Sequence, residues 1–322
     1  MRVNILRAAT LLCGAALLGI LGGCARKPAM GIFVDPAFGP LIAPDTKLLA
    51  GVRLDKVRET PVYKKLDKQF DLDRRLDLFS RRTGLDPRKD LWQVLVASNG
   101  QNFLVMARGK FTTGEMEPQL GALGRERTSY KDYTLIGNPQ TSVVFINAGV
   151  AVAGTQEDLK YLIDHRAEYK NVPPALSAKL ATLPHDDQMW LVDDGALAGW
   201  RTARPDTTGM RSLLSNLVGS IRATTVGVHL DEGAQMKAAV DCVSDQGARR
   251  VHDALKGGIG LARLNTRDDQ MQMLKLYDAI QVDQSGSHVT ISAEVPPNLV
   301  EPMLKMLPNL KNKSESRSEP GP

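Results

Sequence analysis

Alternating apolar and polar positions mark several stretches of this chain as half-buried β-strands. The alternation is clearest over residues 47–54, 236–242 and 289–295. Successive side chains of a strand point to opposite faces of a sheet, so a period of two predicts strands with one face on a core and the other toward solvent. Strands of this kind are typical of antiparallel sheets.

Turn residues between these runs predict hairpins. Asn99-Gly100 separates two apolar runs, and both residues tolerate the positive φ of a type I′ turn. A second hairpin is predicted around residues 285–287, and residues 133–153 have the pattern of a three-stranded meander. Antiparallel neighbours joined by short turns are therefore expected to dominate the sheet.

Apolar residues at three- and four-residue spacing predict helices between the strands. One such stripe covers residues 210–221, and another covers residues 72–79 and is expected to end near Gly84. Thr155 is followed three residues later by Asp158, which resembles the capping box that begins many helices.

The order of these elements predicts an α+β fold in which antiparallel sheets are built from hairpins and flanked by helices. Residues 45–167 form a first α+β half and residues 168–310 a second. Their element order is compatible with two diverged copies of a β-α-β-β-α-β-β-α unit. Residues 311–322 are polar, with two prolines and a glycine, and are predicted to be a disordered tail.

The N-terminus has the three parts of a secretory signal, which we assign to residues 1–23. Arg2 and Arg7 supply positive charge, and residues 8–23 form an uncharged, apolar run. The run ends in Leu-Gly-Gly followed by Cys24, which resembles the lipobox of bacterial lipoproteins. In that motif the cysteine thiol receives a diacylglycerol and becomes the mature N-terminus, so Cys24 is the predicted lipid attachment site.

Two other interpretations of this segment are an uncleaved transmembrane helix and a plain signal peptide. An uncleaved transmembrane helix needs roughly 20 apolar residues, and this run is shorter and rich in glycine near its end. The second interpretation is a plain signal peptide in which the cysteine is incidental. The order of apolar run, small residues and Cys24 favours lipidation, with diacylglycerol and an N-acyl group as the covalent additions and no other cofactor.

Lipidation places the protein in the cell envelope, tethered to a membrane. Ala25 follows the cysteine, which in a Gram-negative source favours the outer membrane, facing the periplasm. Residues 24–44 contain four prolines and little periodicity, and we interpret them as a flexible tether.

Charge and cysteine content narrow the function. The net charge of +5 falls once the signal, with its two arginines, is removed, and so weak an excess on so long a chain is no signature of nucleic-acid binding. Of the three cysteines, Cys13 leaves with the signal and Cys24 is lipidated. Cys242 alone remains, so no internal disulfide is expected. Its position on an apolar strand face predicts burial.

No catalytic, cofactor-binding or metal-binding residues are predicted. The histidines lack the spacing that places two ligands on one helix face, and the Gly-x-Ser-x-Gly elbow of many hydrolases is absent. The paired acids at 186–187, 193–194 and 268–269 are interpreted as caps of helices and strand ends. The glycines at 257–260 lack the Lys-Ser/Thr ending of a phosphate loop and are interpreted as a helix break or a close helix contact.

Three stretches resemble a group of uncharacterised bacterial envelope lipoproteins of the domain-of-unknown-function type. They are the sequence around residues 44–57, the Thr-Gly-Leu-Asp-Pro of residues 83–87 before Asp90-Leu91-Trp92, and the strand-to-helix sequence of residues 150–155. The resemblance implies repeated α+β halves and an envelope location, with no established activity.

Three functions remain open at this level, and whether the chain is an enzyme is uncertain. The preferred interpretation is a membrane-tethered, non-enzymatic binding or assembly module that meets an unknown envelope protein or ligand. The alternatives are an envelope hydrolase without a recognisable motif, and a carrier or chaperone for lipids. A deep pocket with convergent polar groups would favour the hydrolase, a long apolar groove the carrier, and a broad exposed patch the module.

Overall fold

A computed structural model describes residues 31–111, 120, 126–199, 217–267 and 270–305. Cys24, the predicted tail at 311–322, the acids at 268–269 and most of the predicted helix at 210–221 lie outside these residues. Within them, no helix is both long and apolar enough to cross a membrane.

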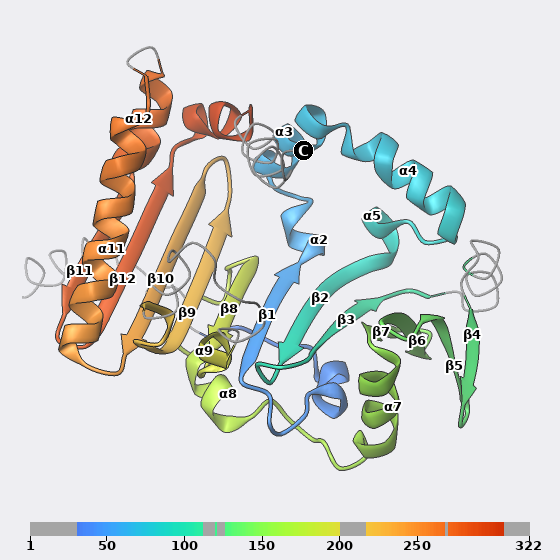
Figure 1. Ribbon diagram of the computed structural model, residues 1–322. Coiled ribbons are helices and arrows are strands. Elements are labelled where there is room, and N and C mark those ends of the chain that lie inside the picture. Colours follow the sequence, from blue (N-terminus) through green and yellow to red (C-terminus); the bar gives the residue numbers. More distant parts are fainter. Residues whose placement is uncertain (1–30, 112–119, 121–125, 200–216, 268–269, 306–322) are drawn as a thin grey trace, which may run out of the picture.

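The strands form one twelve-stranded antiparallel sheet (Figure 1). Its order is β11-β12-β10-β9-β8-β1-β2-β3-β7-β6-β5-β4. The bounds are β1 Leu48–Arg53, β2 Leu91–Ser98, β3 Phe103–Gly109, β4 Arg127–Tyr130, β5 Tyr133–Asn138, β6 Thr141–Asn147, β7 Val150–Gly154, β8 Met189–Asp193, β9 Ile221–Leu230, β10 Ala234–Cys242, β11 Ile280–Ser285 and β12 His288–Val295. The predicted α+β class is confirmed.

The two predicted halves meet in the middle of this sheet. β1, the first strand of one half, pairs with β8, the first strand of the other, and Gly51 lies opposite Trp190 in their register. A Cβ at Gly51 would lie 2.3 Å from the Trp190 ring, so the absent side chain lets the indole pack across the junction. The sheet is therefore continuous across both halves, while descent from one duplicated unit remains a prediction.

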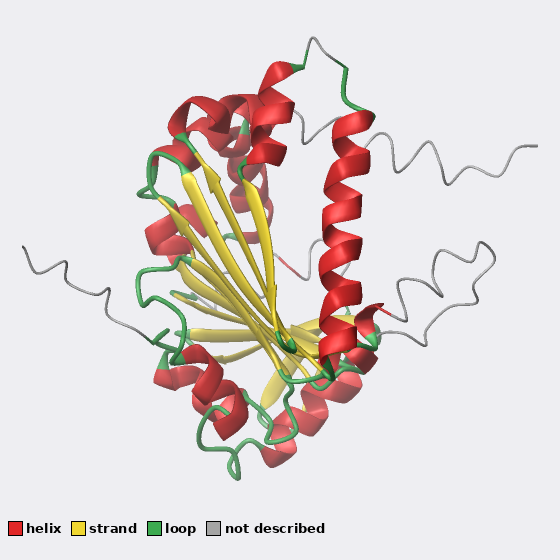
Figure 2. Cartoon of the chain, turned by 90° about the vertical axis from the view of Figure 1, so that its left-hand side faces the viewer, coloured by secondary structure: helices red, strands yellow, loops and turns green. Residues whose placement is uncertain are grey.

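Helices cover both faces of the sheet, which twists so that the strands at its two ends run in different directions (Figure 2). Their bounds are η1 Pro36–Leu41, α2 Leu54–Val57, α3 Pro61–Phe70, α4 Leu72–Thr83, α5 Pro87–Asp90, α7 Gln156–His165, α8 Pro174–Leu180, α9 Ala196–Gly199, α11 Asp245–Leu264 and α12 Met271–Asp278, with residues 297–305 also helical.

Three elements, η1, α7 and α8, pack on one face and form the largest core around Leu49, Leu95 and Met106. α11 covers a separate core on the other face, against β10, β11 and β12. Alternate residues of the strands supply the two cores, as the period of two requires.

Several local predictions are confirmed. α4 ends at Gly84, whose φ of 75° suits a left-handed helix cap. The Thr155 side chain accepts a hydrogen bond from the backbone N–H of Asp158 at the start of α7. Cys242 is buried and free, and burial raises the pKa of its thiol.

The Asn99-Gly100 hairpin exists, but the predicted type I′ turn is wrong. Ser98 pairs with Phe103, so the loop has four residues, and only Gly100, with φ of 97°, has the positive φ that both turn residues would need. Asn99 instead accepts hydrogen bonds through Oδ1 from the backbone N–H groups of Gln101 and Asn102. Its side chain closes the loop without a strained backbone.

The predicted flexible tether at 24–44 is wrong for its described part. From Gly31 onward the chain packs on the body, and Phe38, Leu41 and Ile42 are fully buried. Backbone N–H groups of Gly31 and Ile32 donate to the carbonyls of Leu183 and Leu180. Prolines here shape a short buried helix rather than a spacer, because apolar residues between them reach the core.

Two further predictions need correction. Ile221 begins β9 and does not belong to a helix. The glycines at 257, 258 and 260 lie inside the unbroken helix α11, and a Cβ on any of them would meet nothing within 4 Å among the described residues. They therefore mark neither a helix break nor a close helix contact.

Candidate functional site

A cavity in the described part of the chain lies between α4 and the face of strands β2, β3, β7 and β6 that points away from η1, α7 and α8. Its volume is about 640 Å³, within the range of roughly 300–1,000 Å³ typical of small-molecule sites. The described residues that line it are Phe79, Arg82, Thr83, Leu85, Leu91, Val105, Ala107, Phe111, Leu120, Val143, Phe145, Ala151, Val152 and Ala153.

The floor of the cavity is apolar because alternate residues of neighbouring strands point into it. Ala107 pairs with Ala151 across β3 and β7, which leaves room above two small side chains. Phe111 and Phe145 close one side with ring centroids 5.5 Å apart. Leu85 and Ala151 join the same buried cluster, so the floor is packed and preformed.

The roof of the cavity is α4, which contacts the sheet very little. Only Thr83 of this helix is buried, although Leu72, Leu76 and Phe79 lie on one side at helical spacing. Phe79 lines the cavity and remains 43% exposed. α4 is therefore an amphipathic helix whose apolar side lines the cavity instead of packing in a core.

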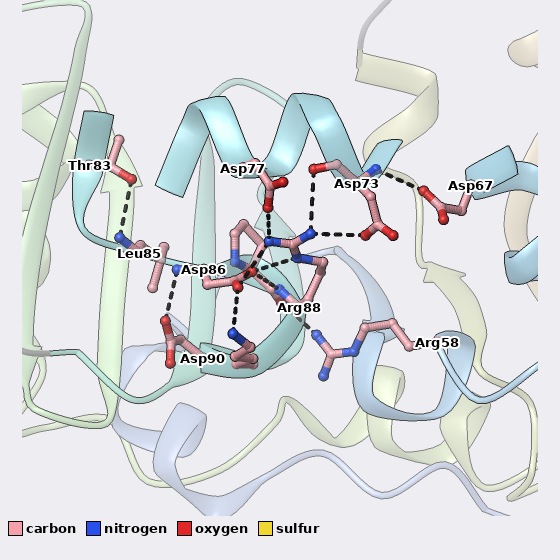
Figure 3. Close-up of polar contacts among 11 residues, drawn as sticks. Arg58, Asp67, Asp73, Asp77, Thr83, Leu85, Asp86, Arg88 and Asp90 are labelled. Atoms are coloured by element: carbon pink, nitrogen blue, oxygen red, sulfur yellow. Dashed lines mark hydrogen bonds and ion pairs between the residues drawn. The ribbon is translucent and has the colours of Figure 1, made fainter. Parts of the chain in front are cut away.

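Ion pairs hold this roof in place (Figure 3). Arg88 of α5 donates from Nη1 to Asp73 Oδ1 at 2.9 Å and from Nη2 to Asp77 Oδ1 at 2.5 Å, and both acids are on α4. Its Nε donates to Asp86 Oδ1 at 2.8 Å. The guanidinium therefore ties α4 to the segment that leads into β2.

The contacts of Arg88 affect the ionisation of the neighbouring carboxyl groups. Hydrogen bonding from Arg88 lowers the pKa of the buried Asp86 carboxyl below its ordinary value. Arg82 lines the cavity and is exposed, and it has no ion pair or hydrogen bond with the described part of the chain. Among the described residues, Arg82 is thus a cation without a partner at the edge of the cavity.

The paired acids, for which the sequence predicts the same capping role, have different contacts in the structure. Asp193 caps α9, where its Oδ1 accepts from the backbone N–H groups of Ala196 and Leu197. Asp194 pairs with Lys179. Capping is therefore confirmed for Asp193 and wrong for Asp186 and Asp187, which lie beside His229.

The histidines fall into two groups. Three contact a neighbour in a way that suits a surface position: His165 Nδ1 with the carbonyl of Tyr161, His252 with Asp253 and His288 with Asp241. The Nδ1 atoms of His185 and His229 lie 3.9 and 3.7 Å from the carboxylate of Asp186. In the described chain, ligand atoms of Asp186, Asp187 and His229 all lie within 4.8 Å of one another.

Comparison with known proteins adds little about function. No family model matches the chain. No curated protein matches it either. Among solved structures, crystal forms I, III and IV of TP0453, a Treponema envelope protein, are 9%, 10% and 9% identical, with TM-scores of 0.44, 0.48 and 0.47. The matches cover 85% of this chain and 97–98% of TP0453. A similarity this distant says nothing of what the chain binds.

Proposed function

We propose that this chain is a lipid-anchored protein of the cell envelope that binds a fatty acyl chain in the cavity beneath α4. The observation that carries the proposal is the cavity itself, which is lined mainly by apolar side chains and whose roof helix turns Phe79 toward it. Among the sequence-level alternatives this favours the lipid carrier, because the convergent polar groups of a hydrolase do not line the cavity in the described chain.

An acyl chain suits these walls on energetic grounds. Each methylene taken out of water contributes about 0.8 kcal/mol, so a chain gains affinity along its length without specific polar contacts. Valine, alanine and phenylalanine offer smooth walls of this kind, and Ala107 and Ala151 leave the space that larger residues would fill.

Arg82 is the proposed partner of the ligand's polar end. An acyl chain in nature carries a carboxylate or an ester-linked headgroup, and burying its tail leaves this group at the rim. A guanidinium binds carboxylate and phosphate through paired N–H donors. Arg82 lies at the cavity, exposed and without a partner among the described residues, so it is placed to meet that group.

The anchor is supported by the sequence around Cys24 and by where the body begins. Gly31 already packs on the body, so fewer than ten residues separate it from Cys24. So short a connection would hold the body close to the membrane, where acyl chains are found.

Binding can be tested with the full chain purified in detergent and a dansyl-labelled fatty acid as the probe. Phe79→Ser should weaken binding about tenfold or more, because burying a phenylalanine side chain contributes about 1.5–3 kcal/mol. Leu78→Ser is the matched control: Leu78 is 44% exposed on the same helix but does not line the cavity, so binding should be unchanged.

Two further variants sharpen this test. Ala107→Phe should block the probe by filling the cavity, and Arg82→Glu should weaken a fatty acid more than the corresponding alcohol, which carries no charge. Equal binding by the wild type, Phe79→Ser and Ala107→Phe would show that the probe binds elsewhere and would refute the proposal.

The anchor is tested separately. Cys24→Ser should leave an unprocessed precursor and abolish labelling by a fatty-acid analogue in cells. Persistent labelling would show that the lipid attachment site is wrong, and it would leave the cavity measurement unaffected.

A further inference from the structure

We propose that Asp186, Asp187 and His229 form a binding site for a transition-metal dication of the Zn²⁺ type. The site lies on the opposite face of the sheet from the acyl cavity, in a depression of about 240 Å³. The proposal does not depend on the acyl-binding function.

The three side chains come from two segments that the fold brings together. Asp186 and Asp187 lie in the loop before β8, and His229 lies near the end of β9. Their candidate ligand atoms all lie within 4.8 Å of one another. Three atoms this close lie at most about 2.8 Å from a common centre, so side-chain shifts of under about 1 Å would bring all three to coordination distances of about 2.0–2.2 Å.

Gln188 fixes the two segments relative to each other. Its backbone N–H donates to the carbonyl of Val228, and its side chain both accepts from the N–H of Leu230 at 2.7 Å and donates to the carbonyl of Leu230 at 3.0 Å. These bonds lie on either side of His229. The loop and the strand are therefore held in register without a ligand, as a preorganised metal site requires.

The second observation is the carboxylate of Asp187. This residue is only 5% exposed, yet its carboxylate makes neither a hydrogen bond nor an ion pair with the described residues. Buried carboxylates are ordinarily paired, because an unpaired charge away from water is costly. Burial, and then the nearby Asp186, raise the pKa of Asp187, and His229 and Lys237 oppose this shift only in part.

The backbone is shaped around this carboxylate. A Cβ at Gly227 would lie 2.0 Å from Asp187 Oδ2, so only glycine leaves space for the side chain there. Gly227 has an ordinary strand conformation and pairs with Trp190 in β8. Close approach of the carboxylate, rather than a special backbone angle, is therefore the reason this position needs glycine.

The ligand chemistry selects the class of ion. Imidazole favours zinc and its neighbours, whereas calcium and magnesium prefer all-oxygen sites, so one histidine with two carboxylates points to the first group. Three protein ligands leave a coordination position open to water or to a small ligand. Lys237 lies opposite Gly227 in β10 and is the competing cation, although it forms no ion pair with Asp187.

Calorimetric titration of the full chain with ZnCl₂, using a purification tag without histidine, tests the site. Wild type should bind one Zn²⁺, and His229→Gln and Asp187→Asn should each weaken binding by more than about tenfold. Glu232→Gln, in the exposed turn after β9, removes a nearby carboxylate outside the cluster and should leave the affinity unchanged. Lys237→Met should tighten binding, because it removes the competing charge.

A folding measurement keeps the result interpretable if a variant is perturbed. Without metal, Asp187→Asn should melt at the same temperature as wild type or higher, since it removes an unpaired buried charge, and Zn²⁺ should raise the melting temperature of wild type but not that of Asp187→Asn. Failure of wild type to bind Zn²⁺ at about 1 mM, or equal binding by wild type, His229→Gln and Asp187→Asn, would overturn the proposal.

Discussion

Two helices on the same face of the sheet, α4 and α11, are held in different ways. The first turns of α11 bury Gly247, Ala248 and Val251 against β10, β11 and β12. α4 buries only Thr83 and is tied down through Arg88. A helix held by apolar side chains closes the space beneath it, whereas one held by ion pairs at its edge leaves a cavity.

The difference follows from composition. In α4, six arginines and aspartates lie in the stretch from Asp73 to Arg82, and four of them lie between the apolar residues Leu72 and Phe79. Ion pairs at a protein surface contribute little individually, and their strength depends on salt and pH. The roof of the cavity is therefore expected to be the more easily released of the two helices, which suits a site that must admit a ligand.

Removing Arg88 should have the largest effect. Arg88→Met keeps the length of the side chain but leaves the buried Asp86 with only the exposed Lys89 as an ion-pair partner, and it frees Asp73 and Asp77. We expect a loss of about 2–3 kcal/mol in the free energy of unfolding, the lower end for broken buried pairs because the two α4 acids are half exposed. Urea denaturation measures the loss, and hydrogen exchange should show that α4 becomes the least protected helix.

The matched control is Arg81→Met. Arg81 is an exposed arginine at the end of the same helix without a partner in the described chain, so its loss should change stability by less than about 0.5 kcal/mol. Similar losses in both variants would mean that α4 is not held through Arg88, and the contrast between the two helices would fail.

A substitution in the buried part of α11 should cause a smaller loss in the free energy of unfolding, and this loss should not depend on salt. Val251→Ala removes buried methyl groups and should cost about 2 kcal/mol, from lost burial and the cavity left behind. This loss should be the same in low and high salt, whereas that of Arg88→Met should shrink as salt rises. A Val251→Ala effect that varied with salt would contradict an apolar attachment of α11.

Acid should release α4 before α11. Because hydrogen bonding from Arg88 lowers the pKa of Asp86, the folded value lies below the unfolded one. The resulting stabilisation is complete above about pH 4 and is lost as the pH falls through the folded pKa. The difference in urea midpoint between wild type and Arg88→Met should therefore narrow from pH 7 to pH 3, and a constant difference would refute this linkage.

The contrast also separates what sequence patterns can predict from what they cannot. The bounds of α4, its end at Gly84 and the β11-β12 hairpin follow from local signals, since spacing and turn residues act over a few positions. The prolines within residues 32–42 dominate the local pattern and favour a tether, whereas the burial of this segment depends on a core to which η1, α7 and α8 contribute.

The candidate sites are formed by residues that are far apart in the sequence. The alternating acids and arginines of residues 71–90 look like a solvated surface, and only the fold reveals that Arg88 gathers three of the acids. Asp187 and His229 are far apart in sequence, and the register of β8 with β9 brings them together. A spacing search finds ligands on one helix face, so it misses a pair joined across a sheet. Gly227, an isolated glycine inside an apolar strand, was the available signal.

The smallest expected effect concerns the solvent side of the later turns of α11, whose other side still packs on the core through Leu255 and Ile259. Gly257 and Gly258 lie in the helix interior, and a Cβ on either would meet nothing within 4 Å among the described residues. Glycine in a helix costs about 0.5–1 kcal/mol relative to alanine, so Gly257→Ala and Gly258→Ala should each stabilise the protein by up to that amount. Thermal denaturation measures the gain, and Gly247→Ala is the comparison, because a Cβ there would lie 3.2 Å from Ser220 in the packed part of the helix. Equal gains in melting temperature at all three positions would mean that Gly247 is no more tightly packed than Gly257 and Gly258. Destabilisation at Gly257 or Gly258 would show that these glycines meet a surface absent from the described chain, which would make the exposed end of α11 a contact site and α4 the freer of the two helices.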